Sequence, residues 1–203
     1  MDTVGERWAL LVVRELLLGP KRFGDLSAGL PHASQSVLSQ RLKELDSAGL
    51  IRRVKLGPPV SAHVYELTDA GRGLEPALIA LARWGAILPA APDATMSPDA
   101  FALGLKALYT PTTNDAFRTT GEVRLGDDVF TVDAGPTGLA VRRGQAAARD
   151  FDLTGAVTEI WKVVTGDREL AEAVESGAVS ITGDTTAVRE FFTRFRSSSS
   201  MTA

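Results

Sequence analysis

The stretch SQSVLSQRLKELDSAGLIRR, residues 34–53, decides the fold of the first half of the chain. Ser34 is suited to cap a helix, and Gly49 is suited to end it. The apolar residues between them share one helical face: Val37, Leu38, Leu42 and Leu45. The polar face has two interpretations. It is either the solvated side of an ordinary amphipathic helix or a surface that presents Ser, Gln and Arg to a nucleic acid.

The segments around this helix predict a small helical domain with a hairpin. Two helices are expected before it, over 5–19 and 21–31, and two β-type runs after it, LIRRVKL and HVYELT. A last helix is expected over roughly 68–88. A helix pair with a short turn followed by a charged hairpin is the pattern of a winged helix-turn-helix.

The helix over 5–19 is apolar nearly all round, so it must be covered on more than one side. A domain of about 90 residues offers little core for this. We therefore predict a homodimer whose contacts come from this helix and the last one: Trp8, Leu11, Leu74, Leu78, Leu81 and Trp84. The alternative is that these residues belong to the core of one domain.

The stretch ILPAAPDATMSPDA, 87–100, has the composition of a linker, which predicts a domain boundary near residue 92. Beyond it we expect a helix capped by Ser97, then four short strands over 117–155 in an antiparallel meander. Two helices, a strand and a closing helix follow. The predicted fold class is α+β, with residues 1–91 as a winged helix-turn-helix domain and 92–203 as a second domain with an antiparallel-rich sheet.

Composition limits the possible classes. The chain is 44% hydrophobic and 23% charged, as in ordinary globular proteins. Without cysteine, disulfides and thiol chemistry are excluded, and no apolar run has the ~18–20 residues of a membrane span. The start MDTVGERW lacks the basic segment of a signal peptide. We expect a cytoplasmic protein that does not bind membranes, with no cofactor and no metal.

Charge is distributed unevenly along the chain. Residues 1–89 hold 11 basic and 9 acidic residues, whereas residues 90–203 hold 11 and 16. Residues 21–63 hold seven basic residues against three acidic ones. A positive region on an acidic chain indicates either a site for a polyanion or a solvated basic face.

Three segments resemble the HxlR family of bacterial transcription regulators: VGERWALLVVRELLLGPKRFGDL, LPHASQSVLSQRLKELDSAGLIRR and VYELTDAGRGLEPALIALARWG. Together they cover about residues 3–88. The resemblance implies a winged helix-turn-helix that binds double-stranded DNA. Many members carry an upstream cysteine, and this sequence has none.

With this resemblance, the helix of the opening stretch is predicted to enter a major groove, because Gln pairs with adenine and Ser serves several bases. A two-fold dimer would read a pseudo-palindromic operator. The turn before the second helix and the hairpin supply phosphate contacts. The predicted DNA-binding residues are Lys21, Arg22, Ser34, Gln35, Ser36, Ser39, Gln40, Arg41, Lys43, Arg52, Arg53, Lys55 and His63.

The segment RDFDLTGAVTEIWKVVTGDRELAEAVESGAVSITGDTTAVREFF resembles the sterol carrier protein domain. That resemblance implies an α/β sandwich over about 97–196 with an apolar tunnel for a lipid-like ligand. The predicted lining residues are Phe101, Leu105, Leu108, Phe130, Val132, Val141, Trp161 and Phe191. The alternative is a closed core, with the domain serving as a structural or protein-interaction module. No catalytic motif is present in the sequence, so we expect a regulator and not an enzyme.

Overall fold

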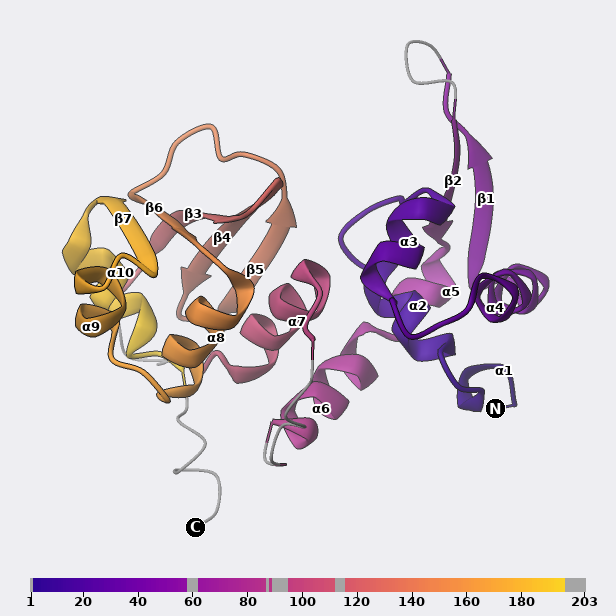
Figure 1. Ribbon diagram of the computed structural model, residues 1–203, viewed down its shortest axis with the longest axis horizontal. Coiled ribbons are helices and arrows are strands. Elements are labelled where there is room, and N and C mark those ends of the chain that lie inside the picture. The colour runs from indigo at the N-terminus through magenta and orange to yellow at the C-terminus, as the bar shows by residue number, and fades with distance from the viewer. Residues whose placement is uncertain (1, 58–61, 87, 89–94, 112–115, 196–203) are drawn as a thin grey trace. The chain divides into compact units, whose positions relative to one another are not determined.

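The computed structural model describes residues 2–57, 62–86, 88, 95–111 and 116–195 (Figure 1). Over these residues the protein is of the mixed α+β class. It divides into two compact units, Met1–Ala80 and Leu81–Ala203, and the division falls within helix α6. The boundary predicted near residue 92 lies outside the described residues.

The first unit is a winged helix-turn-helix whose wing, the two-stranded sheet of β1 and β2, follows helix α4. Strands β1 and β2 pair antiparallel with Arg53 opposite Tyr65. Lys21 forms an isolated bridge to Tyr65 on the other side of β2. The elements up to the division are α1 (Asp2–Gly5), α2 (Ala9–Leu16), α3 (Phe23–Gly29), α4 (Gln35–Ser47), β1 (Ile51–Lys55), β2 (His63–Leu67), α5 (Asp69–Arg72) and α6 (Glu75–Gly85).

Two predicted helices are shorter than the sequence suggested. The helix expected over 5–19 begins only at Ala9, because Trp8 adopts a left-handed backbone with φ 76°. The helix expected over 68–88 is broken into α5 and α6. Proline cannot donate the hydrogen bond of a helix interior but is accepted in a first turn. Pro76 therefore favours a new helix starting at Glu75.

Leucines form the core of the first unit. Leu38, Leu42 and Leu45 of α4 are buried, as predicted, but Val37 is 37% exposed. Successive helix residues are 100° apart, so a helix that points Leu38 into the core turns Val37 toward its edge. Apolar residues of α2, α3 and both wing strands are also buried in this core, among them Val12, Leu16, Leu26, Ile51 and Leu67.

The second unit has a five-stranded sheet in the order β5-β4-β3-β6-β7. The predicted antiparallel meander is wrong in its last strand, because β6 pairs parallel with β3. The connection 144–150 crosses the sheet, where Ala146 N donates to Glu122 Oε2 at 3.2 Å and Asp150 N donates to Thr120 O at 2.8 Å. The elements are α7 (Pro98–Leu108), β3 (Thr119–Leu125), β4 (Asp128–Gly135), β5 (Gly138–Arg143), β6 (Phe151–Gly155), α8 (Val157–Thr165), α9 (Leu170–Glu175), β7 (Val179–Gly183) and α10 (Thr185–Phe192).

The helices of this unit pack against one face of its sheet (Figure 1). Along β3 the inward residues, such as Val123, alternate with polar residues that point to the other face, such as Thr120. Gly121 is required on the inward side, because a Cβ there would lie 2.1 Å from Cζ of Phe151. The largest buried side chains of the core are Phe101, Phe130, Phe151 and Phe191.

Candidate nucleic-acid interface

Helix α4 presents a polar first turn to solvent. Its N-cap is Ser34, as predicted, whose Oγ accepts a hydrogen bond from Val37 N at 3.3 Å and lies 3.0 Å from Ser36 Oγ. Ser34, Gln35 and Ser36 are all exposed. The first turn of α4 therefore presents its polar side chains to solvent, whereas the leucines of the same helix are buried.

Further along α4, the predicted contact residues differ in their exposure and in their hydrogen-bond and ion-pair partners. Lys43 is exposed, and Ser39 is half-buried. Gln40 Nε2 donates to Glu44 Oε1 at 2.7 Å. Arg41 is half-buried and pairs with Glu44 and, at 3.3 Å, with Glu6. Gln40 and Arg41 are thus held by the protein's own carboxylates.

The structure separates the predicted cations of the first unit into two groups. Three of them form ion pairs: Lys21 Nζ lies 2.8 Å from Glu15 Oε2, Arg52 Nε lies 2.6 Å from Glu66 Oε1, and Arg41 pairs as described. Within the described part of the chain, four have no carboxylate partner: Arg22, Lys43, Arg53 and Lys55. The uncompensated positive charge of these predicted positions therefore comes from these four.

The wing separates its cations by strand geometry. Successive side chains of a strand point to opposite faces, so Arg53 and Lys55 share one face of β1 and Arg52 takes the other. Arg52 is opposite Glu66 in the register, which explains their ion pair. His63 is opposite Lys55 and is exposed. The loop tip, 58–61, lies outside the described residues.

The first unit also contains a buried carboxylate. Glu15 of α2 is 0% exposed, and its two oxygens accept from Arg14 Nη2 at 2.9 Å and Lys21 Nζ at 2.8 Å. A Cβ on Gly29 of α3 would lie 2.4 Å from Glu15 Oε2. Through Lys21, which is bridged to the wing at Tyr65, this carboxylate ties α2 to both α3 and the wing. No pattern in the sequence had indicated a buried role for Glu15.

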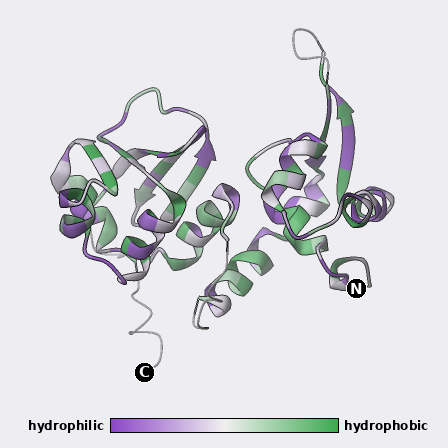
Figure 2. Ribbon diagram, viewed as in Figure 1, coloured by the Kyte–Doolittle hydropathy of each residue, from purple (hydrophilic) through white to green (hydrophobic). Residues whose placement is uncertain are grey.

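The six predicted dimer residues also divide by exposure. Leu78 is buried, at 5%, and Trp8, Leu11 and Leu74 are half-buried. Leu81 is 48% exposed and Trp84 is 61% exposed. Helix α6, which carries both, consists mostly of hydrophobic residues, whereas β1 is largely hydrophilic (Figure 2). An apolar surface is therefore present on the second half of α6.

The eight predicted ligand-lining residues lie in the second unit. All are buried except Trp161, which is half-buried and meets the edge of Phe101 with ring centroids 6.0 Å apart. Among the described residues of this unit lie cavities of about 600 Å³ and about 490 Å³. None of the eight residues lines either cavity, so their role in ligand binding stays a prediction.

The described residues contain no group of His, Cys, Asp or Glu side chains arranged to hold a metal ion. None of the described helices combines the length and apolar composition that a membrane span requires.

Comparison with known proteins assigns the first unit. Residues 3–90 match the HxlR-like helix-turn-helix family. The HTH-type transcriptional regulator YvaP of Bacillus subtilis is 39% identical over 84 residues, which are 41% of this chain and 78% of that protein. The chain belongs to the HxlR-like helix-turn-helix family.

Other matches cover a similar share of this chain. The HTH-type transcriptional regulator Rv3095 of Mycobacterium tuberculosis is 42% identical over 87 residues, which are 42% of this chain and 53% of that protein, so the chain spans about half the length of this relative. The solved structure of the reduced form of the regulator YodB from B. subtilis is 32% identical over 41% of this chain and 82% of that chain, with a TM-score of 0.39.

A solved structure of the sec-alkylsulfatase Pisa1 from Pseudomonas sp. matches 50% of this chain and 17% of that enzyme, with 20% identity and a TM-score of 0.45. A superposition at that level supports no statement about the chemistry of the second unit. The similarity of that unit to sterol carrier proteins stays a prediction.

Proposed function

We propose that the chain is a dimeric transcription regulator that binds double-stranded DNA in a sequence-specific way. The observation that carries the proposal is the build of α4, whose leucines are buried while its Ser and Gln first turn is exposed. Family membership over residues 3–90 supports the same function.

In the proposed complex, α4 enters the major groove with its N-terminal residues toward the base edges. Gln35 is the chief candidate for reading a base, because its amide can pair bidentately with adenine. Ser36 is small enough to let the helix axis approach. The four unpaired cations, Arg22, Lys43, Arg53 and Lys55, are assigned to phosphates or groove edges.

The Gln35→Ala variant tests base reading. Loss of a base contact weakens binding to the cognate sequence more than binding to random DNA, whereas loss of a phosphate contact weakens both alike. The cognate sequence is first selected from a random duplex pool, and affinities for it and for a scrambled duplex are then compared. Equal losses on both duplexes would remove Gln35 from base reading. Ser47→Ala, at the other end of α4, is the control.

The dimer is proposed from the exposed apolar residues of α6. Leu81 and Trp84 are three residues apart and so share a helical face. Tryptophan is among the residues enriched in the centres of interfaces. A two-fold dimer would set two copies of α4 about 34 Å apart, one turn of DNA, and would read a pseudo-palindromic operator.

The Leu81→Ser, Trp84→Ser double variant tests this assignment by sedimentation equilibrium. It should shift the chain from dimer toward monomer. Val174→Ser, which removes another exposed apolar side chain (40% exposed) from the second unit, should not. A double variant that stays as dimeric as the wild type would contradict the assignment.

Control by an apolar or lipid-like ligand in the second unit is also proposed. The support is the cavity of about 600 Å³, because ligand sites are concave and mostly apolar. Its walls come from α8, α9, β7 and α10 and include Val163, Leu170, Val174, Ile181 and Phe192. A ligand there regulates DNA binding only if it favours one dimer arrangement over another.

The test is operator affinity of the full chain with and without dodecanoate as the probe, in the wild type and in Val174→Glu. The Val174→Glu variant places a charge in the cavity and should abolish both binding and any effect. Dodecanoate that binds without changing operator affinity would contradict regulation. The alternative function, a structural or protein-interaction module, would then be favoured.

A further inference from the structure

The arginines of the second unit differ in whether they form ion pairs, and this difference points to a second binding site. From Arg118 onward, each described arginine except two forms an ion pair with a carboxylate, as Arg124 does with Glu122 and Arg142 does with Asp133. The exceptions in that part of the chain are Arg118 and Arg189. Arg118 lines the cavity of about 490 Å³, and Arg189 lines the cavity of about 600 Å³.

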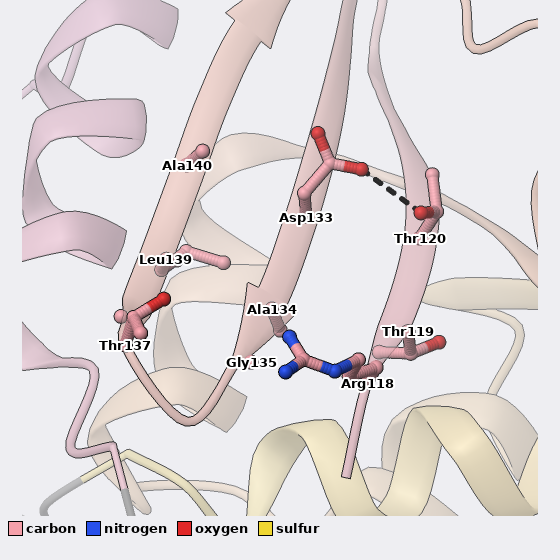
Figure 3. A pocket seen from close by; sticks show the side chains of 10 residues that line it. Arg118, Thr119, Thr120, Asp133, Ala134, Gly135, Thr137, Leu139 and Ala140 are labelled. Atoms are coloured by element: carbon pink, nitrogen blue, oxygen red, sulfur yellow. Dashed lines mark hydrogen bonds between the residues drawn. The ribbon is translucent and has the colours of Figure 1, made fainter.

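Arg118 lines a cavity of about 490 Å³ at one end of the sheet. Figure 3 shows β4 as the floor, with Thr120 on one side and Ala140 on the other. The guanidinium of Arg118 lies across the floor at Gly135, where a Cβ would be 3.4 Å from Nη1. The hollow exists because Gly135, Gly138 and Ala140 have little or no side chain to fill it.

The polar groups around the hollow are of two kinds. The Arg118 guanidinium is a fork of five N–H donors that suits a carboxylate or a phosphate. Asp133 lies at the opposite end of the floor, where its Oδ1 accepts from Thr120 Oγ1 at 2.9 Å and its Oδ2 accepts from Arg142 Nη2 at 2.7 Å. Each oxygen keeps capacity for one more hydrogen bond. The hydroxyl of Thr137 is at the rim.

We propose that this cavity binds a small polar anion, with its carboxylate or phosphate on Arg118 and a hydroxyl or amino group donating to Asp133. The ion pair of Asp133 with Arg142 offsets its negative charge, which leaves Arg118 as the uncompensated charge lining the hollow. Asp150 is also near, but its Oδ2 is occupied by Thr119 Oγ1 and Thr120 N at 2.8 Å. The site shares no residue with the cavity of about 600 Å³ or with the predicted DNA-binding residues, so it does not depend on the proposed function.

The experiment follows the amides of Gly135 and Gly138 in ¹H–¹⁵N spectra of the full chain. Four probes are titrated: glycerol 3-phosphate, glycerate, inorganic phosphate and glycerol. We expect saturable shifts of both amides with the first two, weaker binding of phosphate, and none with glycerol. Arg118→Gln should weaken binding of glycerol 3-phosphate by at least about tenfold, because it removes one charged hydrogen-bonding fork.

Two further variants complete the test. Arg189→Gln removes the other unpaired guanidinium and should leave the titration unchanged. Asp133→Ala, which removes both acceptor oxygens, should weaken glycerate more than phosphate, since only glycerate carries an alcohol hydroxyl beyond its anionic group to donate to Asp133. The proposal is overturned if neither organic anion gives a saturable shift up to about 20 mM. It is also overturned if Arg118→Gln binds as the wild type does, or if glycerol binds as tightly as glycerate.

Discussion

Arg52 and Arg53 are neighbours of one residue type on one strand, and they provide a test of how charge is used in the wing. Arg53 has no carboxylate partner in the described chain, whereas Arg52 pairs with Glu66. The perturbation is Arg53→Met, which removes one uncompensated charge. The control is Arg52→Met with Glu66→Gln, which removes one charge of each sign from the same hairpin and leaves the net charge unchanged.

The magnitude follows from counterion release. Each phosphate neutralised contributes about −0.9 to the slope of log affinity against log salt concentration. The proposed dimer has two copies of Arg53, so Arg53→Met should flatten the slope by about 1.8. Between roughly 50 and 200 mM salt, the wild type should then lose about twelvefold more affinity than the variant loses. The control should leave the slope at its wild-type value.

The assay is fluorescence anisotropy with a random-sequence duplex across that range of salt concentrations. Random sequence is sufficient, because phosphate contacts are made on any sequence. The reasoning is refuted if Arg53→Met keeps the wild-type slope. It is equally refuted if the control flattens the slope as much as Arg53→Met does, since pairing with Glu66 would then not neutralise Arg52.

Three further predictions concern stability. Glu15→Gln removes the buried carboxylate that holds Arg14 and Lys21, and it should lower protection of the α2 amides in hydrogen exchange by about 1–3 kcal/mol; unchanged protection would contradict this role. Gly121→Ala forces a Cβ to 2.1 Å from the Phe151 ring and should cost about 1–3 kcal/mol at the β3 amides, whereas Gly57→Ala, with nothing within 4 Å, should cost less than ~0.5 kcal/mol. A hydrogen bond from Lys162, joined by one from Arg168 and opposed by burial, holds the pKa of Glu159 below its usual value. Because the folded pKa is the lower one, this stabilisation is present at neutral pH and is lost as pH falls through the folded pKa. Glu159→Gln should therefore have a lower melting temperature than the wild type near pH 7, and the difference should shrink toward about pH 3; a difference independent of pH would argue against the pair.

Local signals in the sequence predicted where most helices begin and end. Ser34 and Ser97 act as N-caps, and Gly49 takes a left-handed backbone just past α4. These signals work because capping and glycine conformation depend on a few neighbouring residues. The interruption at Trp8 had no such signal, since a non-glycine residue with positive φ is uncommon.

The sheet of the second unit shows which features local sequence signals do not predict. The two tight turns predicted at Gly126-Asp127 and Gly135-Pro136 do join β3, β4 and β5. The next connection, 144–150, is long enough to cross two strands, and nothing in its own residues fixes where it lands. Its course depends on Glu122 and Thr120 of β3, which are more than twenty residues earlier and accept hydrogen bonds from it.

The sequence shows which residue types the candidate interface holds, but not which of its cations form ion pairs. Register alone explains the difference between Arg52 and Arg53, because Ile51 and Leu67 are both buried and opposite each other, which places Arg52 against Glu66. That pair could be deduced once the hairpin register was known, and the Gln40–Glu44 bond could be deduced from helical spacing. The pairing of Lys21 with Glu15 requires the packing of α2 against the wing. The absence of an ion pair at Arg118 was harder still to predict from the sequence, because it depends on which cation each carboxylate of the second unit pairs with. Unpaired cations are thus a property of the whole fold, which is why the sequence alone did not predict which cations would lack a carboxylate partner.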